Sequence, residues 1–461
     1  MIRVKVHSVP FFTLLLLGSL VSCTSKEDFP ETSHNEYYAG GNQTAFISGA
    51  GAFSSAFPFL NASQSRVHEI GDIGFEATFV SGSQVDLGGL GPVYNNVSCG
   101  SCHIADGRGK APEAGESLSS LLIRISVPGT NEQGGPLGVP GYGGQFQPRS
   151  IYGVAKEGDV NYSYEYLHGS FADGETYELR QPVIELNNTY STLPSDVMLS
   201  PRLASPVFGL GLLEAIPESS ILAHEDALDA NNDGISGKAN RVWEVQKNRF
   251  SLGRFGWKAG QPSVIQQSAG AYVEDMGITN TIFTLESVYG QPQQSAANSH
   301  VELSDSTLHA VAFYVQTLAV PARRDVEKPQ VQRGKTLFTQ IGCANCHTPQ
   351  QRTGVDVVFR AVSNQVIFPY TDLLLHDMGE ELADNRPEFD ADGKEWRTAP
   401  LWGIGLTGVV NGHTNFLHDG RARNFTEAIL WHGGEGNNSR QAFKNLTSTD
   451  RQALLAFLKS L

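Results

Sequence analysis

The 461-residue chain has only five cysteines and four methionines, and basic residues are scarce, with 33 against 48 acidic ones. The formal net charge of -15 would repel nucleic acid, so we expect no nucleic-acid partner. The longest apolar run, residues 9–20, is shorter than the roughly 18 residues that a membrane-spanning helix needs. With 40% hydrophobic and 18% charged residues, the composition is that of a globular protein.

The first 22 residues have the pattern of an export signal, because basic residues precede the apolar run and the run ends in Leu20-Val21-Ser22-Cys23. This ending resembles the lipobox of bacterial lipoproteins, in which the cysteine is acylated and becomes the N-terminus. Ordinary signal cleavage nearby is the alternative. Two or more acyl chains anchor a protein stably. We therefore expect a lipid anchor to the membrane at Cys23, a polar tether over residues 23–45, and an exported outer-membrane lipoprotein facing the periplasm or the cell surface.

The other four cysteines fall into two copies of one motif, Cys99-Gly-Ser-Cys102-His103 and Cys343-Ala-Asn-Cys346-His347. CxxCH is the signature of covalent haem attachment, in which the thiols form thioethers to the vinyl groups and the histidine ligates the iron. A zinc site would place its cysteine pairs about 15 to 20 residues apart, and a thioredoxin-type CxxC has no reason to precede histidine twice. We expect two covalently bound haem c groups, haem 1 at His103 and haem 2 at His347.

Helical patterns surround both motifs. Residues 308–318 form an amphipathic helix before a proline stop, and residues 449–458 repeat this pattern at the C-terminus. A further helix over 332–338 leads into the second motif. In a cytochrome c domain the last helix packs against the first, so we expect two cytochrome c-like domains, over 46–322 and 328–461.

Three segments rich in β-formers, residues 121–127, 176–186 and 356–370, predict small hairpins. The expected fold class is therefore mainly α, with inserted loops and small β hairpins between the helices of the two domains.

Residues 229–240 resemble an EF-hand loop. Asp229, Asn231 and Asp233 supply oxygens at positions 1, 3 and 5, and Ile235 supplies a carbonyl at position 7. Position 12 is Asn240 instead of a bidentate glutamate, so the site would be weaker or completed from elsewhere. Calcium is the predicted ligand, and a turn without metal is the alternative.

Many short blocks, in one order along nearly the whole mature chain, carry a family resemblance. They include Gly107-Arg108-Gly109, Gly209-Leu-Gly-Leu-Leu-Glu214, Gly253-Arg254-Phe-Gly-Trp257-Lys258, Asp275-Met276-Gly277, Trp396-Arg397-Thr398 and His418-Asp419-Gly420-Arg421. The chain resembles the di-haem oxidoreductase family, whose members are classed as peroxidases and also as thiol oxidoreductases. More distantly, the second half resembles bacterial di-haem cytochrome c peroxidases. The resemblance implies that peroxide reacts at one haem and electrons enter through the other.

The sixth ligand of each iron distinguishes an electron-carrying haem from a catalytic one. An iron with two strong axial ligands has no free position for a substrate. The residue that lines up with the sixth ligand of haem 2 in the related peroxidases is His432. Met378 is the alternative ligand, and His432 could instead merely cap its helix. Three histidines could reach haem 1 in some fold, although a polar loop histidine is usually solvated: His68, His168 and His224.

Glu214 lies in an otherwise apolar stretch, which raises the pKa of a carboxyl and suits it to shuttle a proton between peroxide oxygens at an open haem 1. The alternative is a buried structural glutamate paired with Arg202, and both residues are candidates for the catalytic site. Trp257 is either an electron relay between the haems or a core residue.

The predicted function is a di-haem c-type oxidoreductase of peroxidase type, with haem 1 reactive and haem 2 transferring electrons. Its expected partners are an electron-donor protein or small redox molecule, with peroxide as the candidate substrate. The alternatives are an electron carrier with both irons six-coordinate and a haem module that serves an iron-handling partner.

Overall fold

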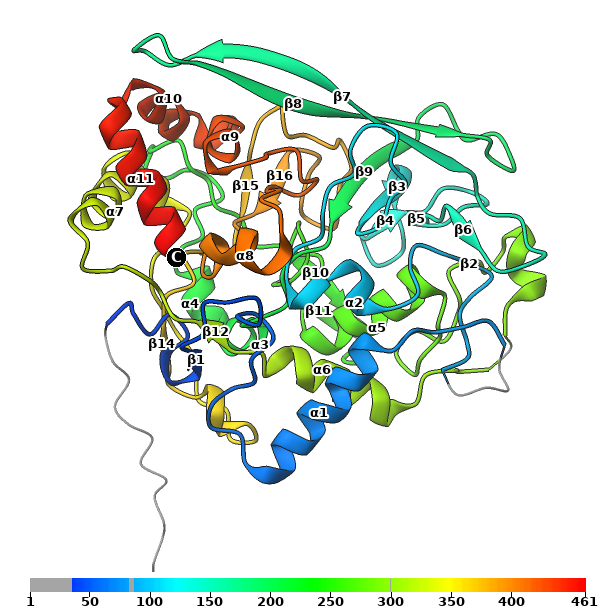
Figure 1. The fold of residues 1–461 in the computed structure, drawn as a ribbon. Coiled ribbons are helices and arrows are strands. Elements are labelled where there is room, and N and C mark those ends of the chain that lie inside the picture. Colours follow the sequence, from blue (N-terminus) through cyan, green and yellow to red (C-terminus); the bar gives the residue numbers. More distant parts are fainter. Residues whose placement is uncertain (1–34, 83–86, 299) are drawn as a thin grey trace, which may run out of the picture. The chain divides into compact units, whose positions relative to one another are not determined.

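The computed structural model describes residues 35–82, 87–298 and 300–461, which belong to one compact unit (Figure 1). The predicted signal peptide and the lipidated Cys23 lie outside the described residues. Within these ranges, no helix combines the length and the apolar character needed to cross a bilayer.

Helices and strands are interspersed along the unit, with a run of strands from β3 to β9 and a run of helices from α8 to α11. The α-helices are α1 (Ala62–Glu76), α2 (Cys99–Cys102), α3 (Leu210–Glu214), α4 (Glu218–Leu222), α5 (Val264–Met276), α6 (Asp305–Gln316), α7 (Pro329–Gln340), α8 (Thr407–Asn411), α9 (Phe425–Leu430), α10 (Asn437–Asn445) and α11 (Ser448–Ser460). The strands are β1 (Thr44–Ala45), β2 (Val93–Tyr94), β3 (Leu121–Thr130), β4 (Pro136–Leu137), β5 (Gln145–Phe146), β6 (Arg149–Ser150), β7 (Asp159–Ser170), β8 (Thr176–Asn187), β9 (Met198–Leu203), β10 (Arg241–Glu244), β11 (Arg249–Leu252), β12 (Val320–Pro321), β13 (Gln351–Arg352), β14 (Val366–Ile367), β15 (Leu375–Asp377) and β16 (Glu395–Arg397).

Two pairs of helices cross in close contact, α1 with α6 and α7 with α11 (Figure 1). A glycine lies at each crossing. A Cβ atom on Gly71 would come within 2.0 Å of the Ala310 carbonyl oxygen, and one on Gly334 within 2.0 Å of the Ala453 carbonyl oxygen. Only glycine permits this approach. The predicted packing of the last helix against the first is confirmed in both halves of the chain.

Buried apolar side chains gather in one cluster around α1, α5 and α6 and in another around α7, α9 and α11. Cys99 packs against the first cluster and Cys343 against the second. The domain boundary expected between residues 322 and 328 stays a prediction.

The strand content exceeds the prediction, so the fold is mixed α and β instead of mainly α. Strands β7 and β8 pair antiparallel over twelve residues each, and β3 belongs to a four-stranded sheet with β4, β5 and β9. The β7–β8 hairpin extends over α9 and α10 in Figure 1. At its tip, Phe171 contacts Phe443 edge to face, and Asp173 pairs with Arg451 at 2.8 Å. The hairpin therefore joins the two halves of the chain.

Two segments differ from the sequence expectations. Residues 39–45, placed in the tether, are folded: β1 pairs in parallel with β12, and the Gln43 side chain donates to the Ala361 carbonyl at 3.0 Å. Residues 356–370 contain only the short strand β14, because the Asp356 carboxylate accepts from the backbone N–H groups of Val358 and Phe359 and folds a turn there.

Candidate haem centres

The first CxxCH segment opens on a cavity of about 370 Å³, the Cys99 cavity, which is lined by Cys99, Cys102 and His103 among others. Helix α2 presents the two thiols, and the Ser98 side chain caps it by accepting from the Ser101 N–H. His103 Nδ1 lies 2.7 Å from the Ser205 carbonyl oxygen. Since a carbonyl can only accept, Nδ1 carries the proton and Nε2 keeps its lone pair.

The second segment opens on a cavity of about 190 Å³, the Cys343 cavity, which is lined by Cys343, Cys346 and His347. His347 Nδ1 lies 3.0 Å from the Tyr370 carbonyl oxygen, so its Nε2 is likewise available. Burial, together with the nearby His432, lowers the pKa of His347 to about 4. The imidazole is therefore neutral, the form that ligates a metal.

His432 faces His347 across the Cys343 cavity. The centres of the two rings lie 6.5 Å apart, and His432 Nδ1 lies 2.7 Å from the Ala428 carbonyl oxygen, which leaves its Nε2 free. Two imidazoles that ligate one iron from opposite sides have ring centres about 6 Å apart, because each metal–nitrogen bond is about 2 Å long and each ring centre lies about 1 Å beyond its nitrogen. The hydrogen bond to Ala428 also satisfies the helix end, so capping and ligation are compatible.

The other two histidines on the lining of this cavity contact neighbouring side chains. His376 lies 2.9 Å from Asp372 through Nε2 and 2.7 Å from Glu435 through Nδ1. His418 stacks on Trp396 with ring centres 3.7 Å apart. Met378 lines the cavity as well and remains the alternative to His432.

One wall is common to both cavities. Arg108, Trp257 and Arg397 line each of them. The Trp257 indole N–H donates to the Leu203 carbonyl at 2.8 Å, and the Arg397 N–H donates to the Trp257 carbonyl at 2.9 Å. The guanidinium carbon of Arg108 lies 5.4 Å from the centre of the Trp257 ring. These bonds hold the indole in place between the cavities.

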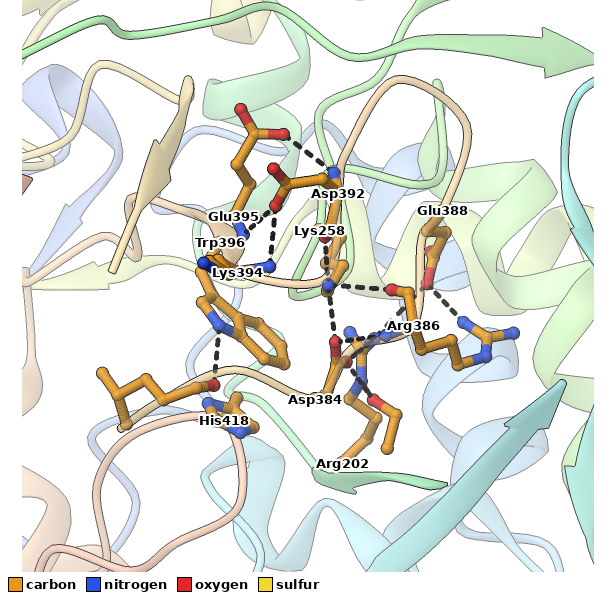
Figure 2. Close-up of polar contacts among 12 residues, drawn as sticks. Arg202, Lys258, Asp384, Arg386, Glu388, Asp392, Lys394, Glu395, Trp396 and His418 are labelled. Atoms are coloured by element: carbon orange, nitrogen blue, oxygen red, sulfur yellow. Dashed lines mark hydrogen bonds and ion pairs between the residues drawn. The ribbon is translucent and has the colours of Figure 1, made fainter. Parts of the chain in front are cut away.

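An ionic cluster, drawn in Figure 2, contributes three residues to the lining of the Cys99 cavity. Lys258, which is fully buried, pairs with Asp384 at 2.8 Å, and Arg202 pairs with the same carboxylate at 3.2 Å. Arg202 also reaches Glu388 at 3.5 Å, and Arg386 reaches it at 3.0 Å. Arg202, Arg386 and Glu388 line the cavity, so the cluster fixes charged groups at its surface.

Glu388 is the carboxylate that the sequence reasoning missed. Burial raises the pKa of its carboxyl, but Arg202 and Arg386 outweigh burial and hold that pKa below its ordinary value. Its Oε1 atom packs against Gly260, where a Cβ atom would come within 1.9 Å of it. The group is therefore ionised and fixed at the cavity.

Residues 34–461 match the model of a family described as "Di-haem oxidoreductase, putative peroxidase". The chain belongs to the di-haem oxidoreductase family. No curated protein matches it.

Solved structures similar to this di-haem oxidoreductase include hydrazine synthase of Kuenenia stuttgartiensis, 18% identical with a TM-score of 0.23, over 38% of this chain and 66% of that one. A MauG-like protein associated with microbial copper homeostasis is 17% identical with a TM-score of 0.28, over 45% of this chain and 71% of that one.

The residues of this di-haem oxidoreductase fit haem. Each cavity combines two thiols with a neutral imidazole whose Nε2 is available. In addition, the Nε atom of Arg108 is buried without a hydrogen-bond partner among the described residues. An orphaned buried donor beside a cavity indicates a bound group with acceptor atoms.

Glu214 is not among the described lining residues of either cavity. Burial raises the pKa of its carboxyl as predicted, but one oxygen accepts from the Val264 N–H at 2.8 Å and the other from the Gln316 side chain at 2.6 Å. The predicted pairing with Arg202 is wrong, because Arg202 pairs with Asp384 and Glu388. Glu214 caps the start of α5, and only Arg202 of the two catalytic candidates reaches the Cys99 cavity.

None of the three histidines considered for haem 1 is among the described lining residues of the Cys99 cavity. His68 lies 2.7 Å from the Thr317 hydroxyl, His168 lies on β7 near Glu178, and His224 is exposed. The lining of this cavity includes the buried thioether of Met276. Met276 belongs to the Asp275-Met276-Gly277 segment that carries the family resemblance, and the sequence alone predicted no role for it.

The predicted calcium loop is exposed, and its carboxylates are bonded to its own backbone. Asp229 accepts from the N–H groups of Asp233 and Gly234, at 2.9 and 3.2 Å. Asn240 is turned away and donates to the Lys258 carbonyl at 2.7 Å. Within residues 35–82, 87–298 and 300–461, no three His, Cys, Asp or Glu side chains are grouped to hold a metal. Calcium binding at Asp229, Asn231, Asp233 and Ile235 stays a prediction.

Proposed function

We propose that this di-haem oxidoreductase binds both haems covalently and reduces peroxide at haem 1, in the Cys99 cavity, with electrons passed from haem 2, in the Cys343 cavity. The observation that carries the proposal is that a second histidine faces the motif histidine in the Cys343 cavity but not in the described lining of the Cys99 cavity. His432 stands 6.5 Å from His347, ring centre to ring centre, whereas His103 is the sole histidine in the described lining of the Cys99 cavity.

Bound haem would supply electron transfer where two strong ligands hold the iron, and peroxide chemistry where the iron has a free coordination position. The chain supplies the attachment and the proximal ligands. Cys99 and Cys102 would form the thioethers to haem 1, and Cys343 and Cys346 those to haem 2. His432 would complete the coordination of haem 2, which suits that haem to electron transfer.

Glu388 is the group that we assign to proton exchange in the Cys99 cavity. Reduction of hydrogen peroxide to two waters consumes two electrons and two protons. Glu388 is ionised and can take a proton from peroxide and return it to the leaving oxygen, as a weaker base than the carboxyl of raised pKa that the sequence predicted for this role. Arg202, through its contacts to Asp384 and Glu388, is a positioning residue for this carboxylate.

Trp257 is the residue that we assign to electron transfer between the haems. Its indole lines both cavities, and its N–H and backbone carbonyl are both engaged, so the ring is held without rearrangement. A fixed aromatic group between two redox centres shortens the distance that an electron must cross through the intervening wall.

A second function is favoured by one observation. Met276 is a thioether on the Cys99 cavity, and thioether ligation of haem 1 would make both irons six-coordinate, as in an electron carrier. We place Met276 second because it is also packed in the apolar cluster with Phe75 and Leu308.

The cellular setting belongs to the proposal as well. Covalent haem attachment and the lipobox both require export, so we propose a lipoprotein anchored through Cys23 at the outer membrane. Its electrons would come from a donor protein or a small redox molecule.

Peroxide consumption by the purified holoprotein tests the proposal, with a reduced one-electron dye as donor. Two dye molecules should be oxidised for each peroxide, and Met276→Leu should keep this activity. Holoprotein that carries two haems and leaves peroxide untouched would contradict the peroxidase assignment. A chain without haem would contradict the haem assignment instead.

A further inference from the structure

The wall common to both cavities contains two arginines, Arg108 and Arg397, that form no ion pair within the described part of the chain. Arg108 is 5% exposed, and its hydrogen-bond acceptor is the Leu417 carbonyl at 3.3 Å from Nη1. Arg397 donates from Nε to the Gly256 carbonyl at 2.9 Å and from Nη1 to the Thr398 carbonyl at 3.3 Å. No carboxylate in the described part of the chain forms an ion pair with either guanidinium.

The other arginines of the Cys99 cavity are paired. Arg202 and Arg386 form ion pairs with Glu388, and Arg124 forms one with Glu274 at 3.4 Å. Unpaired guanidinium groups are therefore not a general property of this cavity. They occur among its lining arginines at the two positions that also line the Cys343 cavity.

Both unpaired groups stay charged. Burial lowers the pKa of Arg108 to about 10, and it lowers that of Arg397 to about 10 against the attraction of Asp372, so both groups are protonated at neutral pH. A buried charge needs a partner, and Arg108 has none among the described side chains. Arg397 is half-buried and has only the longer-range attraction of Asp372. An anionic group bound where both cavities meet would pair with both guanidinium groups.

We propose that Arg108 and Arg397 bind the propionate groups of the two haems and form a cationic bridge between them. This inference rests on the proposed occupancy of both cavities by haem. A haem carries two carboxylates, and a guanidinium binds a carboxylate through two parallel N–H···O bonds. The orphaned Arg108 Nε is a donor of the kind that such a bond requires.

The bridge has a redox consequence. A positive charge beside a haem favours the reduced form, because reduction adds an electron to the iron. Since each arginine lines both cavities, its charge acts on both haems. Arg108 and Arg397 therefore hold the midpoint potentials of haem 1 and haem 2 up together, whereas Arg124, on the Cys99 cavity alone, acts on haem 1.

The test is a spectroelectrochemical titration of the full holoprotein, with resonance Raman spectra of the propionate bending bands as a second readout. The variants are Arg108→Gln and Arg397→Gln, with Arg108→Lys as the charge-conserving variant and Arg124→Gln as the matched control. Both midpoint potentials should fall in the two glutamine variants and recover in part in R108K. Arg124→Gln should lower only the potential of haem 1, and the propionate bands should shift in R108Q and R397Q alone.

Unchanged potentials and propionate bands in R108Q and R397Q would overturn the proposal, and so would a shift confined to one haem. If R108Q fails to fold, R397Q and R108K still decide the question. Wild-type protein without haem absorbance would refute the proposed occupancy, which this experiment therefore separates from the bridge itself.

Discussion

The Cys99 cavity and the Cys343 cavity contain the same CxxCH motif, but the other residues that line them differ in charge and in histidine content. The Cys99 cavity has one histidine and a wall of charged groups, which comprises Arg108, Arg124, Arg202, Asp275, Arg386, Glu388 and Arg397. The Cys343 cavity has four histidines on its lining, His347, His376, His418 and His432, and a largely apolar remainder. In the proposed function, the motif attaches the haem, and the residues on the facing wall decide whether a second ligand closes the iron or proton-exchanging groups lie beside it.

The two cavities also differ in which part of the chain completes them. Arg386, Glu388 and Arg397 come from the C-terminal half and line the Cys99 cavity, which carries the N-terminal motif. The histidine that faces His347 in the Cys343 cavity, His432, comes from the same half as its motif. The proposed reactive centre therefore depends on contacts across the chain.

Removal of the facing ligand should have the largest effect. His432→Ala should eliminate the low-spin signal of haem 2, since a six-coordinate iron would lose one strong ligand. Electron paramagnetic resonance measures the change directly. Met378→Leu is the matched control and should leave the signal intact. The reverse pattern would make Met378 the ligand.

Glu388→Gln should slow the reaction with peroxide by about 10²- to 10⁴-fold, the usual contribution of a positioned acid or base. Stopped-flow absorbance of the holoprotein gives the rate, and the spin states should not change. Glu214→Gln, whose carboxylate bonds to Val264 and Gln316 away from the cavity, should react at nearly the wild-type rate. Equal losses in both variants would remove Glu388 from the proposed role.

Asp384→Asn should cost about 3–5 kcal/mol of unfolding free energy at pH 7, because it leaves the fully buried Lys258 without its partner. Burial raises the pKa of Asp384, but Arg202 and Lys258 outweigh it and hold that pKa below the ordinary value. The contribution of Asp384 is therefore present above pH of about 4 and is lost as the pH falls through its folded-state pKa.

Denaturant unfolding at several pH values checks this, and the gap between wild type and D384N should shrink in acid. The exposed pair of Asp450 with Arg333, at 2.8 Å, provides the control. Asp450→Asn should change stability little, since surface ion pairs contribute little.

Gly71→Ala and Gly334→Ala should each lower the unfolding free energy by about 1–3 kcal/mol, because the added methyl group overlaps a backbone carbonyl of the partner helix. Gly270→Ala in α5 has room, with the nearest atom at 3.8 Å, and should stabilise the helix by about 0.5–1 kcal/mol. Thermal unfolding separates the two outcomes. Equal losses of unfolding free energy at Gly71 and Gly334 would show that the α1–α6 and α7–α11 crossings contribute equally to stability.

Trp257→Phe should slow electron transfer between the haems several-fold while leaving both spin states unchanged, because the smaller ring leaves a gap in the shared wall. Flash reduction of haem 2 followed at two wavelengths measures the rate. Trp396→Phe is the control, since Arg202 and Lys258 lie over that ring, at 4.8 and 4.6 Å, and disfavour its oxidation. A larger loss in W396F would move the electron path to Trp396.

The elements that could be predicted from sequence were those set by short-range patterns. The CxxCH segments and the helices that became α6, α7 and α11 follow from spacing and period. The hairpin was underestimated, although Val160, Tyr162, Tyr164 and Tyr166 alternate along β7 and the Asp173-Gly174 turn follows, which is a strand and turn signal.

The far walls of the cavities could not be predicted from local patterns. Glu388 is 285 positions after His103, its neighbourhood has no motif, and its role emerges only through contacts to Arg202 and Arg386. Glu214 looked catalytic because it stands among apolar residues, but its partners, Val264 and Gln316, are distant in sequence. His432 was found by resemblance to the peroxidases, and its distance from His347 now gives it a geometric basis.

Low-temperature electron paramagnetic resonance of the oxidised holoprotein, before and after hydrogen peroxide, tests the central claim most directly. The account predicts a high-spin ferric signal from haem 1 beside a low-spin signal from haem 2, with the high-spin signal consumed by peroxide. Two low-spin signals that persist in peroxide, even after partial reduction, would contradict it and identify the protein as an electron carrier.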